Sequence, residues 1–544
     1  MRADATLSRE TIEPMKKIKV IGGGLAGPEA ALQAASLGCE VTLYEMRPTR
    51  STEAHQTSDF AELVCSNSLK SESENSAPWL LKQEMRRAHS FLLTAADASA
   101  VPAGHALAVD RIEFSRRVQE LIDQHPRITV VREEVIRLDD DPDEITILAT
   151  GPLTSPALTA ELQRLTGSQH LAFYDSISPI VDASTIDMDK VYFAARWDKG
   201  TADYINCPFT KEEYDRFIDA LSTAEAVPAK EWEQIPTALA TAETVAPNTR
   251  HSDPTQHEEN DRHSERSEES QYFSNKATIS KRANIAIGDG EPHSSPQKCH
   301  PERSGEATQS KDLRLTAPSA EEKLKYFEGC LPIEEIARRG RDTLRFGPMK
   351  PAGLTNPRTG RWPYAAVQLR QENLRADSYN LVGFQNHLKY NEQARILRLI
   401  PGLENAKFLR YGQIHRNTYL NSPTVLTDTL QLRAHPRILI AGQLSGVEGY
   451  TESIAGGLLA GRFAATLAQG RTPTPPPRLT AHGSLVHYIT HSEAKTFQPA
   501  NITFDLLLPL EEELRKKIRD KKERHRIQCD RALEAWTAWL TQTS

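Results

Sequence analysis

A glycine-rich turn between a strand-like and a helix-like segment constrains this chain more than any other feature. Residues 18–21 form a short β-rich run, and residues 28–38 predict a helix with proline in its first turn and glycine at its end. The turn between them is a G-x-G-x-x-G motif made of Gly22, Gly23, Gly24, Leu25, Ala26 and Gly27. In such a motif Gly22 allows the tight turn, Gly24 lets the backbone approach a pyrophosphate, and Gly27 lets the helix pack closely on the sheet.

A second strand completes a β-α-β unit. Residues 39–44 are expected to form it, and it stops at Glu45, which lies 18 residues after Gly27. An acidic residue at about this spacing, near ~20, hydrogen-bonds the ribose of a bound dinucleotide. The alternative is a structural glycine turn without a ligand. The strand, the helix and the acid together favour dinucleotide binding.

Two further turns favour FAD over a nicotinamide cofactor. Residues 438–461 predict another strand, turn and helix, with Gly442, Gly446 and Gly449 in the turn. Backbone amides there are expected to reach a second part of one long cofactor. Residues 149–151 resemble the strand-end turn common in two-dinucleotide flavoproteins. We therefore expect bound FAD.

The expected fold class is α/β: a Rossmann-type FAD-binding domain of the two-dinucleotide flavoprotein kind, with an inserted α+β domain and a helical C-terminal tail. Residues 236–318 are polar and lack apolar periodicity, so we expect a disordered insertion there. The other expected parts are a disordered extension at 1–14, the FAD-binding domain at 15–170 and 400–472, the inserted substrate, folate and tRNA domain at 171–235 and 319–399, and a linker with a helical tail at 473–544.

The overall composition argues against a membrane protein and leaves RNA binding open. The 544 residues are 38% hydrophobic, but no run approaches the ~20 apolar residues that span a bilayer. The first residues lack the apolar core of a signal peptide, so a cytoplasmic location is expected. A formal charge of -7 argues against general coating of nucleic acid, although a local basic patch can coexist with it.

The cysteine pattern predicts reduced thiols, two of which are candidates for catalysis. The six cysteines form no C-x-x-C pair, so no metal site is predicted; they are Cys39, Cys65, Cys207, Cys299, Cys330 and Cys529. Cys65 and Cys330 are flanked by glycine, serine or charged residues rather than by an unbroken apolar run. Arginines at 338, 339 and 341 follow Cys330, and nearby cations favour a thiolate. The alternative is that both cysteines are buried structural thiols.

Several longer stretches resemble one enzyme family. They include GGGLAGPEAA, YEMRP, FAELVCSNSLKS, VPAGHALAVDR, YFEGCLPIEE, RGRDTLRFGPMKPAGL, VGFQNHLKYNEQ and AGQLSGVEGYTESIAGG. These stretches are similar to the folate/FAD-dependent tRNA (uracil-5-)-methyltransferases, from about residue 15 to the tail, with a break at 236–318. The resemblance implies that a methylene from 5,10-methylenetetrahydrofolate and electrons from reduced FAD make 5-methyluridine in the T-loop of tRNA. It also implies that NAD(P)H regenerates the reduced flavin.

The resemblance implies roles for individual residues. The two functional thiols of the family map onto Cys65 and Cys330. Uracil C5 is a poor nucleophile until a thiolate adds at C6, and we hypothesise that Cys330 makes this addition. Candidate folate contacts are His387, Tyr390 and His415, and Tyr390 stands where the family usually has tryptophan. For the two histidines, ordinary hydrogen bonding within the protein is the alternative.

Contacts to RNA phosphates are expected from Arg338 and Arg341, and from the basic cluster at 515–526 in the tail. Acidic residues dilute the tail cluster, so a solvated helix face is the alternative there. No membrane and no obligate protein partner are predicted.

Three other functions remain open from the sequence. A related flavoprotein modifies the anticodon wobble uridine together with a GTPase, but it normally carries a longer C-terminal helical domain. A plain flavin oxidoreductase would need a second G-x-G-x-x-G for NAD(P)H, and the sequence has no second copy. The third is a non-enzymatic tRNA-binding or folding factor, which a bound flavin that NAD(P)H bleaches would argue against.

Overall fold

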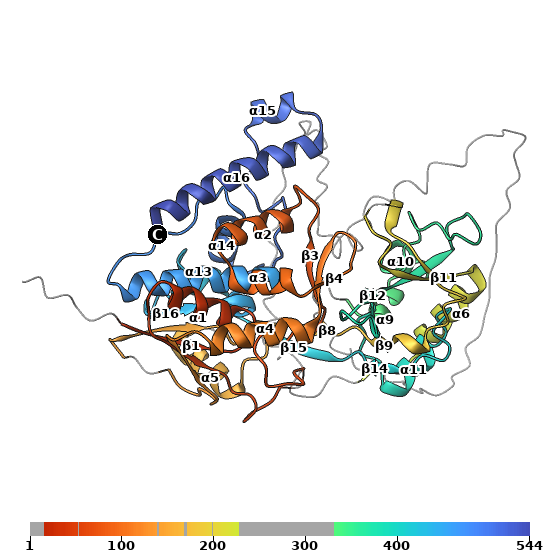
Figure 1. Cartoon of the computed structure of the whole chain (residues 1–544), viewed down its shortest axis with the longest axis horizontal. Helices are drawn as coiled ribbons and strands as arrows, with labels where there is room; N and C mark the ends of the chain where they lie inside the picture. Colours follow the sequence, from red (N-terminus) through yellow and green to blue (C-terminus); the bar gives the residue numbers. More distant parts are fainter. Residues whose placement is uncertain are drawn as a thin grey trace, which may run out of the picture.

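The computed structural model describes residues 16–52, 54–138, 141–167, 171–198, 200–227 and 331–543, which form two lobes (Figure 1). The expected extension at 1–14 and the expected insertion at 236–318 lie outside the described residues, as do Cys299 and Cys330.

The first lobe is built on a five-stranded parallel sheet with the order β16-β7-β1-β2-β6. Its strands are β1 (Lys17–Ile21), β2 (Val41–Tyr44), β6 (Ile128–Val131), β7 (Glu144–Leu148) and β16 (Ile438–Ile440). Helix α1 (Ala26–Ser36) makes the expected crossover from β1 to β2. This arrangement confirms the predicted Rossmann-type fold. The chain returns from the second lobe to add β16 at the edge of the sheet.

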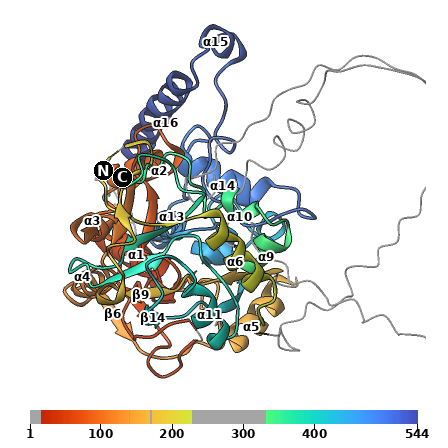
Figure 2. The same cartoon turned by 90° about the vertical axis from the view of Figure 1, so that its right-hand side faces the viewer.

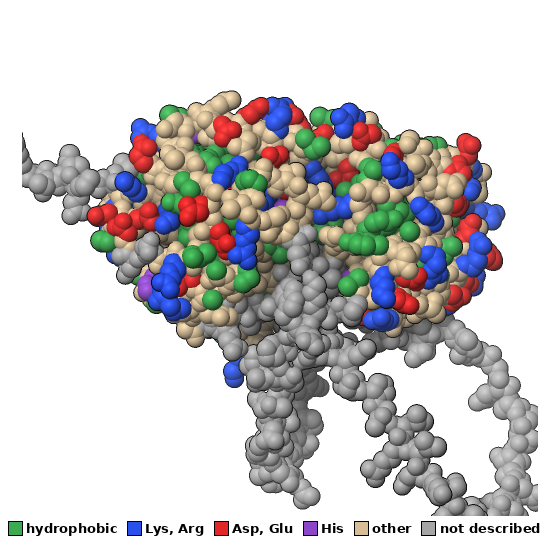
Figure 3. All heavy atoms as spheres, turned by 90° about the horizontal axis from the view of Figure 1, so that it is seen from below, with side chains coloured by type: hydrophobic (Ala, Val, Ile, Leu, Met, Phe, Trp, Pro, Cys, Tyr) green, Lys and Arg blue, Asp and Glu red, His purple; other side chains and the backbone are tan. Residues whose placement is uncertain are grey.

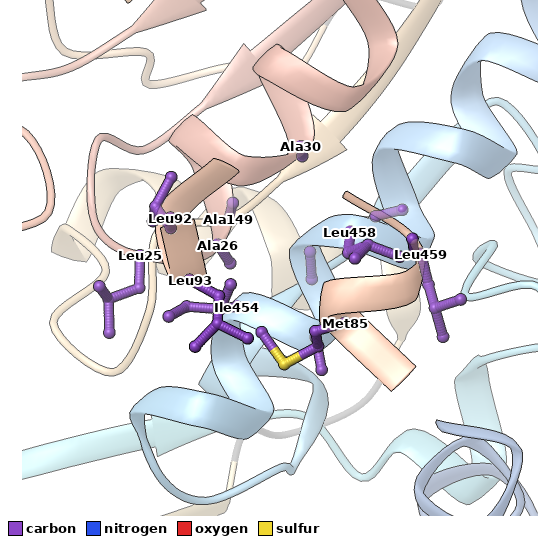
Figure 4. Packing of buried hydrophobic residues seen from close by; sticks show 14 of the residues in the cluster. Leu25, Ala26, Ala30, Met85, Leu92, Leu93, Ala149, Ile454, Leu458 and Leu459 are labelled. Carbon is purple, nitrogen blue, oxygen red and sulfur yellow. The ribbon is translucent and has the colours of Figure 1, made fainter. Parts of the chain in front are cut away.

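The core of the first lobe lies where α1 packs against α13 (Tyr450–Ala468). Figure 4 shows apolar side chains of both helices, among them Ala26 and Ile454, gathered with Leu93. The two helices approach so closely that a Cβ on Gly461 would lie 2.4 Å from the carbonyl oxygen of Ala30. This close packing brings the starts of α1 and α13, and the glycine turns that precede them, to the same region.

A small sheet and further helices complete the first lobe. The sheet has the antiparallel order β3-β5-β4, with β3 at Ser68–Ser71, β4 at Ala100–Val101 and β5 at Ala106–Val109. The helices are α2 (Ala77–Arg87), α3 (Phe91–Ala98), α4 (Arg111–Asp123), α5 (Pro156–Thr166) and α12 (Ser422–Val425).

The second lobe holds a six-stranded antiparallel sheet with the order β10-β11-β12-β13-β9-β14. Its strands are β9 (Ile180–Asp182), β10 (Tyr192–Phe193), β11 (Ile205–Phe209), β12 (Ala365–Gln371), β13 (Ser378–Leu381) and β14 (Phe408–Arg410). Its helices are α6 (Lys211–Ser222), α9 (Ile333–Arg338), α10 (Thr343–Phe346) and α11 (Tyr390–Leu397). Because β14 pairs with β9, this lobe continues past the boundary expected at 399. Strands β8 (Leu171–Ser176) and β15 (Ile414–Tyr419) pair with each other where the chain passes between the lobes.

The C-terminal helices α14 (Ala481–His491), α15 (Glu512–Lys517) and α16 (Lys521–Thr543) belong to the first lobe (Figures 1 and 2). Helix α16 is anchored by Trp536, whose Nε1 donates to the carbonyl of Glu84 at 2.6 Å and whose ring stacks on His482 at 4.3 Å. Among the described helices, none combines the length and the apolar character needed to cross a bilayer. Figure 3 shows acidic and basic side chains interspersed over both lobes.

Glu29 on α1 makes the stability of this core depend on pH. It is fully buried, accepts the Leu92 amide at 2.8 Å and the Gln33 side chain at 3.0 Å, and burial raises its pKa from 4.5 to about 7. A carboxyl with a raised folded-state pKa costs stability as pH rises from the unfolded value to the folded one. The cost approaches about 3 kcal/mol above pH ~7, at ~1.4 kcal/mol per unit.

We therefore expect Glu29→Gln to be as stable as the wild type near pH 4.5 and more stable at pH 8. Its Tm advantage at pH 8 should be several degrees, measured by thermal unfolding across this range. Identical pH dependence of the two proteins would contradict the assignment of a buried, protonated Glu29.

Candidate active site

A cavity of about 130 Å³ lies at the carboxyl ends of the parallel strands. Both glycine turns expected to bind a cofactor contribute to its wall. The lining includes residues 21–26, 44–47, 133–135 and 149–155, together with Gly442, Gln443, Tyr450 and Ser453. A cleft beyond the carboxyl ends of a doubly wound sheet is where such folds bind dinucleotides.

Glu45 occupies the position predicted for the ribose-binding acid. It follows β2, lines the cavity and accepts the Gly23 amide at 2.6 Å. Arg47 donates to the same carboxylate through its backbone amide at 2.9 Å and its Nε at 2.8 Å. Although burial opposes ionisation, these bonds and the Arg47 charge hold the pKa of Glu45 below its usual value. The cavity therefore presents a carboxylate that is ionised at neutral pH.

Gly27 and Gly24 of the motif differ in the space around them. A Cβ on Gly27 would lie 1.8 Å from the carbonyl oxygen of Gly22, so the fold itself requires glycine there. A Cβ on Gly24 would meet no atom within 4 Å. Protein packing does not explain glycine at this position. Gly24 lines the cavity just before the N-terminus of α1, and helix N-termini attract phosphates. Its contact with a cofactor pyrophosphate stays a prediction.

The later turn contributes only in part to the cavity wall. Of its three glycines, Gly442 lines the cavity. A Cβ on Gly446 would lie 2.4 Å from the ring of Phe497, and Gly449 caps α13 with a φ of 107°. Packing and helix initiation therefore account for Gly446 and Gly449. Their assignment to cofactor binding stays a prediction.

The loop that carries Cys65 touches the cavity wall through Tyr450. The backbone amides of Cys65 and Ser66 both donate to the Tyr450 hydroxyl, at 2.7 and 3.2 Å. Tyr450 begins α13 and lines the cavity, and burial raises its pKa, so it is a neutral phenol. Cys65 is partly buried in this loop. The structure thus places one of the two candidate thiols beside the predicted cofactor site.

Two arginines surround the Cys65 loop. Arg111 donates to the Cys65 carbonyl at 3.3 Å and to the Leu63 carbonyl, and it pairs with Glu372 of the second lobe at 2.5 Å. Burial and the Arg111 charge lower the pKa of Arg410, whose Nε has no hydrogen-bond partner among the described residues. Positive charge of this kind favours a negatively charged sulfur or an anionic ligand.

The second lobe holds the Cys65 loop from the other side. Arg370 of β12 donates to the Ser66 hydroxyl at 2.7 Å and to the Asn67 side-chain oxygen at 3.0 Å. Asn67 in turn donates to the carbonyls of Val109 and Gln371, at 3.1 and 2.9 Å. These residues were not singled out from the sequence. The quoted stretch FAELVCSNSLKS contained Asn67, but only the structure shows that it bridges the lobes.

The sequence matches one family model and many named relatives over nearly its whole length. Residues 17–263 and 293–472 match the sequence model of the family described as Glucose inhibited division protein A. A protein of Koribacter versatilis named Methylenetetrahydrofolate–tRNA-(uracil-5-)-methyltransferase TrmFO is 58% identical over 96% of this chain and 98% of its own length. The chain belongs to the methylenetetrahydrofolate–tRNA-(uracil-5-)-methyltransferase family.

Other comparisons agree with this family membership. Proteins of the same name from Solibacter usitatus and Enterococcus faecalis are 52% and 45% identical, over 96% and 95% of this chain and 98% and 97% of their own lengths. A crystal structure of Aquifex aeolicus GidA has a TM-score of 0.59 at 15% identity and covers 97% of this chain and 73% of that chain. At this identity it supports the fold alone. The family resemblance drawn from the motifs is confirmed.

The structure places the residues that the family resemblance suggested as folate contacts in different settings. His387 is buried, with its Nδ1 2.6 Å from Glu334 Oε1. Tyr390 is 56% exposed, and its hydroxyl accepts a hydrogen bond from Gln413 at 2.8 Å. His415 lies on β15, and its side chain falls outside what the structure describes. The folate roles of these residues stay predictions.

Both arginines suggested as phosphate contacts already have acidic partners. Arg338 pairs with Glu335 on the same helix. Arg341 pairs with Asp215 at 3.2 Å and with Asp219, both on α6. Intramolecular pairing reduces the net charge that these residues present to RNA. Their RNA contacts stay predictions.

Proposed function

We propose that this chain methylates C5 of a uridine in the T-loop of cytoplasmic tRNA, giving 5-methyluridine. The carbon would come from 5,10-methylenetetrahydrofolate, and the electrons from FADH2, which NAD(P)H would regenerate; no further protein partner is required. The observation that carries the proposal is the hydrogen bonding of the Cys65 loop to Tyr450, in the wall of the cavity that the two glycine turns line. The relatives with this activity in their names match nearly the whole chain.

The described residues fit FAD. The turn at 22–26 and the N-terminus of α1 would hold the pyrophosphate, because the open backbone at Gly24 lies beside a helix N-terminus, where the first amides have no partner within the helix. Glu45 would hold ribose hydroxyls, and the turn at Gly442 would hold the other half of the molecule. When bound, FAD in its reduced form supplies the two electrons that convert a carbon from the methylene to the methyl level.

The thiols supply the nucleophile that the reaction needs. A thiolate would add to uracil C6 and turn C5 into an enolate carbon that attacks the methylene carbon of the folate. Loss of the C5 proton and cleavage of the carbon–nitrogen bond would release tetrahydrofolate and leave an exocyclic methylene on C5. A hydride, which the reduced flavin would supply, would convert this methylene to the methyl group as the sulfur–carbon bond at C6 breaks and frees the thiolate. We assign this addition to Cys330. The segment that follows it, Leu331 to Glu334, is buried against the second lobe. The uridine would have to leave its stack to reach either thiol.

The proposal is tested by measuring how many flavin molecules are oxidised for each methyl group transferred to tRNA. We expect the purified protein, reduced without oxygen by NAD(P)H, to return to the oxidised flavin only after both methylenetetrahydrofolate and unmodified tRNA are added. One 5-methyluridine should form for each flavin oxidised. Oxidation that needs no tRNA would identify a plain flavin oxidoreductase instead.

A further inference from the structure

An exposed pair of tryptophans stands on the second lobe, away from the cavity lining. Trp197 follows β10 and Trp362 precedes β12; they are 56% and 50% exposed. Their rings meet edge to face with centroids 5.2 Å apart. Large aromatic side chains held in solvent by a rigid scaffold are typical of binding surfaces rather than of cores.

The backbone at Trp197 has a strained conformation. Its φ of 60° lies in the left-handed region, which a bulky residue rarely adopts. The Trp197 amide donates to the carbonyl of Gly353 at 2.8 Å, and a Cβ on Gly353 would lie 2.7 Å from the Trp197 ring. The neighbouring Arg196 donates to the carbonyls of Lys350 and Ala352 at 2.9 and 2.8 Å. Several contacts thus hold an exposed aromatic ring in a costly conformation, which indicates a function for that ring.

The segment around Trp362 is basic. Residues 343–371 contain arginines or lysines at five positions (345, 350, 358, 361 and 370). Of these, Arg345 pairs with Asp342 and Arg370 is buried. Within the described part of the chain, Lys350 and Arg361 have no carboxylate partner, in contrast to Arg338 and Arg341. Aromatic rings beside unpaired cations match the chemistry of single-stranded nucleic acid, whose bases stack and whose phosphates are negative.

The pair also lies near the border between the lobes. The chain that leaves Trp197 reaches the β4–β5 turn of the first lobe, where Asp203 accepts the Gly104 amide at 2.8 Å and the Tyr204 hydroxyl donates to the Ala103 carbonyl at 3.2 Å. A substrate that spans both lobes would pass this point.

We propose that Trp197 and Trp362, flanked by Lys350 and Arg361, form a platform on which unpaired nucleotides of the substrate tRNA stack. This inference rests on the proposed function, because it takes the tRNA as the occupant. A base stacked on an aromatic side chain contributes enough binding free energy for its loss to weaken affinity on the order of tenfold.

The test measures the Kd of unmodified tRNA for Trp197→Ala, Trp362→Ala and Trp362→Phe, with flavin content and oligomeric state recorded for each. We expect each alanine variant to bind about tenfold more weakly and Trp362→Phe to bind nearly as the wild type. Arg361→Ala should reduce the slope of log Kd against log salt concentration by about the amount that one phosphate contact contributes. As a matched control, Ile112→Ala removes another exposed apolar side chain, 73% exposed on α4, and should not change binding.

The outcomes separate the two proposals. Normal tRNA affinity in both alanine variants would overturn the proposed platform. A loss of affinity together with dissociation of a dimer would also overturn it, because the surface would then bind a second copy of the chain. If the wild type binds tRNA through this surface but forms no 5-methyluridine, the platform stands and the proposed function fails.

Discussion

Replacing Cys330 with alanine is expected to abolish methyl transfer, with a fall in kcat on the order of 10³-fold or more, because no other group activates uracil C5. Bound flavin and its reduction by NAD(P)H should remain, since the glycine turns and Glu45, which we propose to hold FAD, are unchanged. The measurement is single-turnover methyl transfer to unmodified tRNA, together with mass spectrometry of a covalent adduct on RNA that contains 5-fluorouridine. The normal reaction removes the C5 hydrogen as a proton, and fluorine at C5 cannot be removed in this way. The adduct should therefore stay covalently bound to the attacking sulfur.

The other cysteines distinguish the roles of the two thiols. Cys65→Ala should also lose turnover, but it should still form the trapped adduct through Cys330. Cys39→Ala is the matched control, because Cys39 is fully buried in the core and burial raises its pKa. An adduct mapped to Cys65, or full activity in Cys330→Ala, would reverse the assignment of the nucleophile.

Replacing Gly24 with alanine is expected to remove the flavin while leaving the protein folded. The added methyl group meets no protein atom within 4 Å, so the Tm of the flavin-free protein should stay near the wild-type value. A methyl group in the path of the pyrophosphate costs about 1–3 kcal/mol of overpacking, which corresponds to a Kd for FAD that is weaker by roughly 10- to 100-fold. Equilibrium binding of FAD to the flavin-free variants measures this directly.

Gly27→Ala provides the contrast. Alanine favours a helix over glycine by about 1 kcal/mol, yet its Cβ would lie 1.8 Å from the Gly22 carbonyl oxygen. We expect this variant to lose thermal stability even without flavin. If Gly24→Ala instead lowers the Tm as much as Gly27→Ala and leaves FAD affinity unchanged, then no cofactor passes over Gly24.

The local parts of the fold were predictable because they depend on neighbouring residues. The strand, the glycine turn and α1 follow from residues 18–38, and Glu45 follows from a fixed spacing in a β-α-β unit. At Gly27 the structure supplies a packing reason for glycine, because a Cβ there would lie 1.8 Å from the Gly22 carbonyl oxygen.

What the sequence could not predict depends on contacts between distant segments. Asn67 and Arg370 are 303 residues apart, and no local sequence pattern at either residue predicts the hydrogen bond between them. Arg341 looked available for RNA because its partners Asp215 and Asp219 lie more than a hundred residues earlier. Strand β14 is short and joins its sheet by pairing with β9, so its membership of the second lobe was not visible from periodicity.

The most direct measurement incubates the purified protein with unmodified tRNA, methylenetetrahydrofolate labelled in its one-carbon unit, and NAD(P)H, and then maps the label in the RNA. We expect the label to appear as 5-methyluridine in the T-loop. Label at the anticodon wobble uridine, or label that never reaches the RNA, would contradict it.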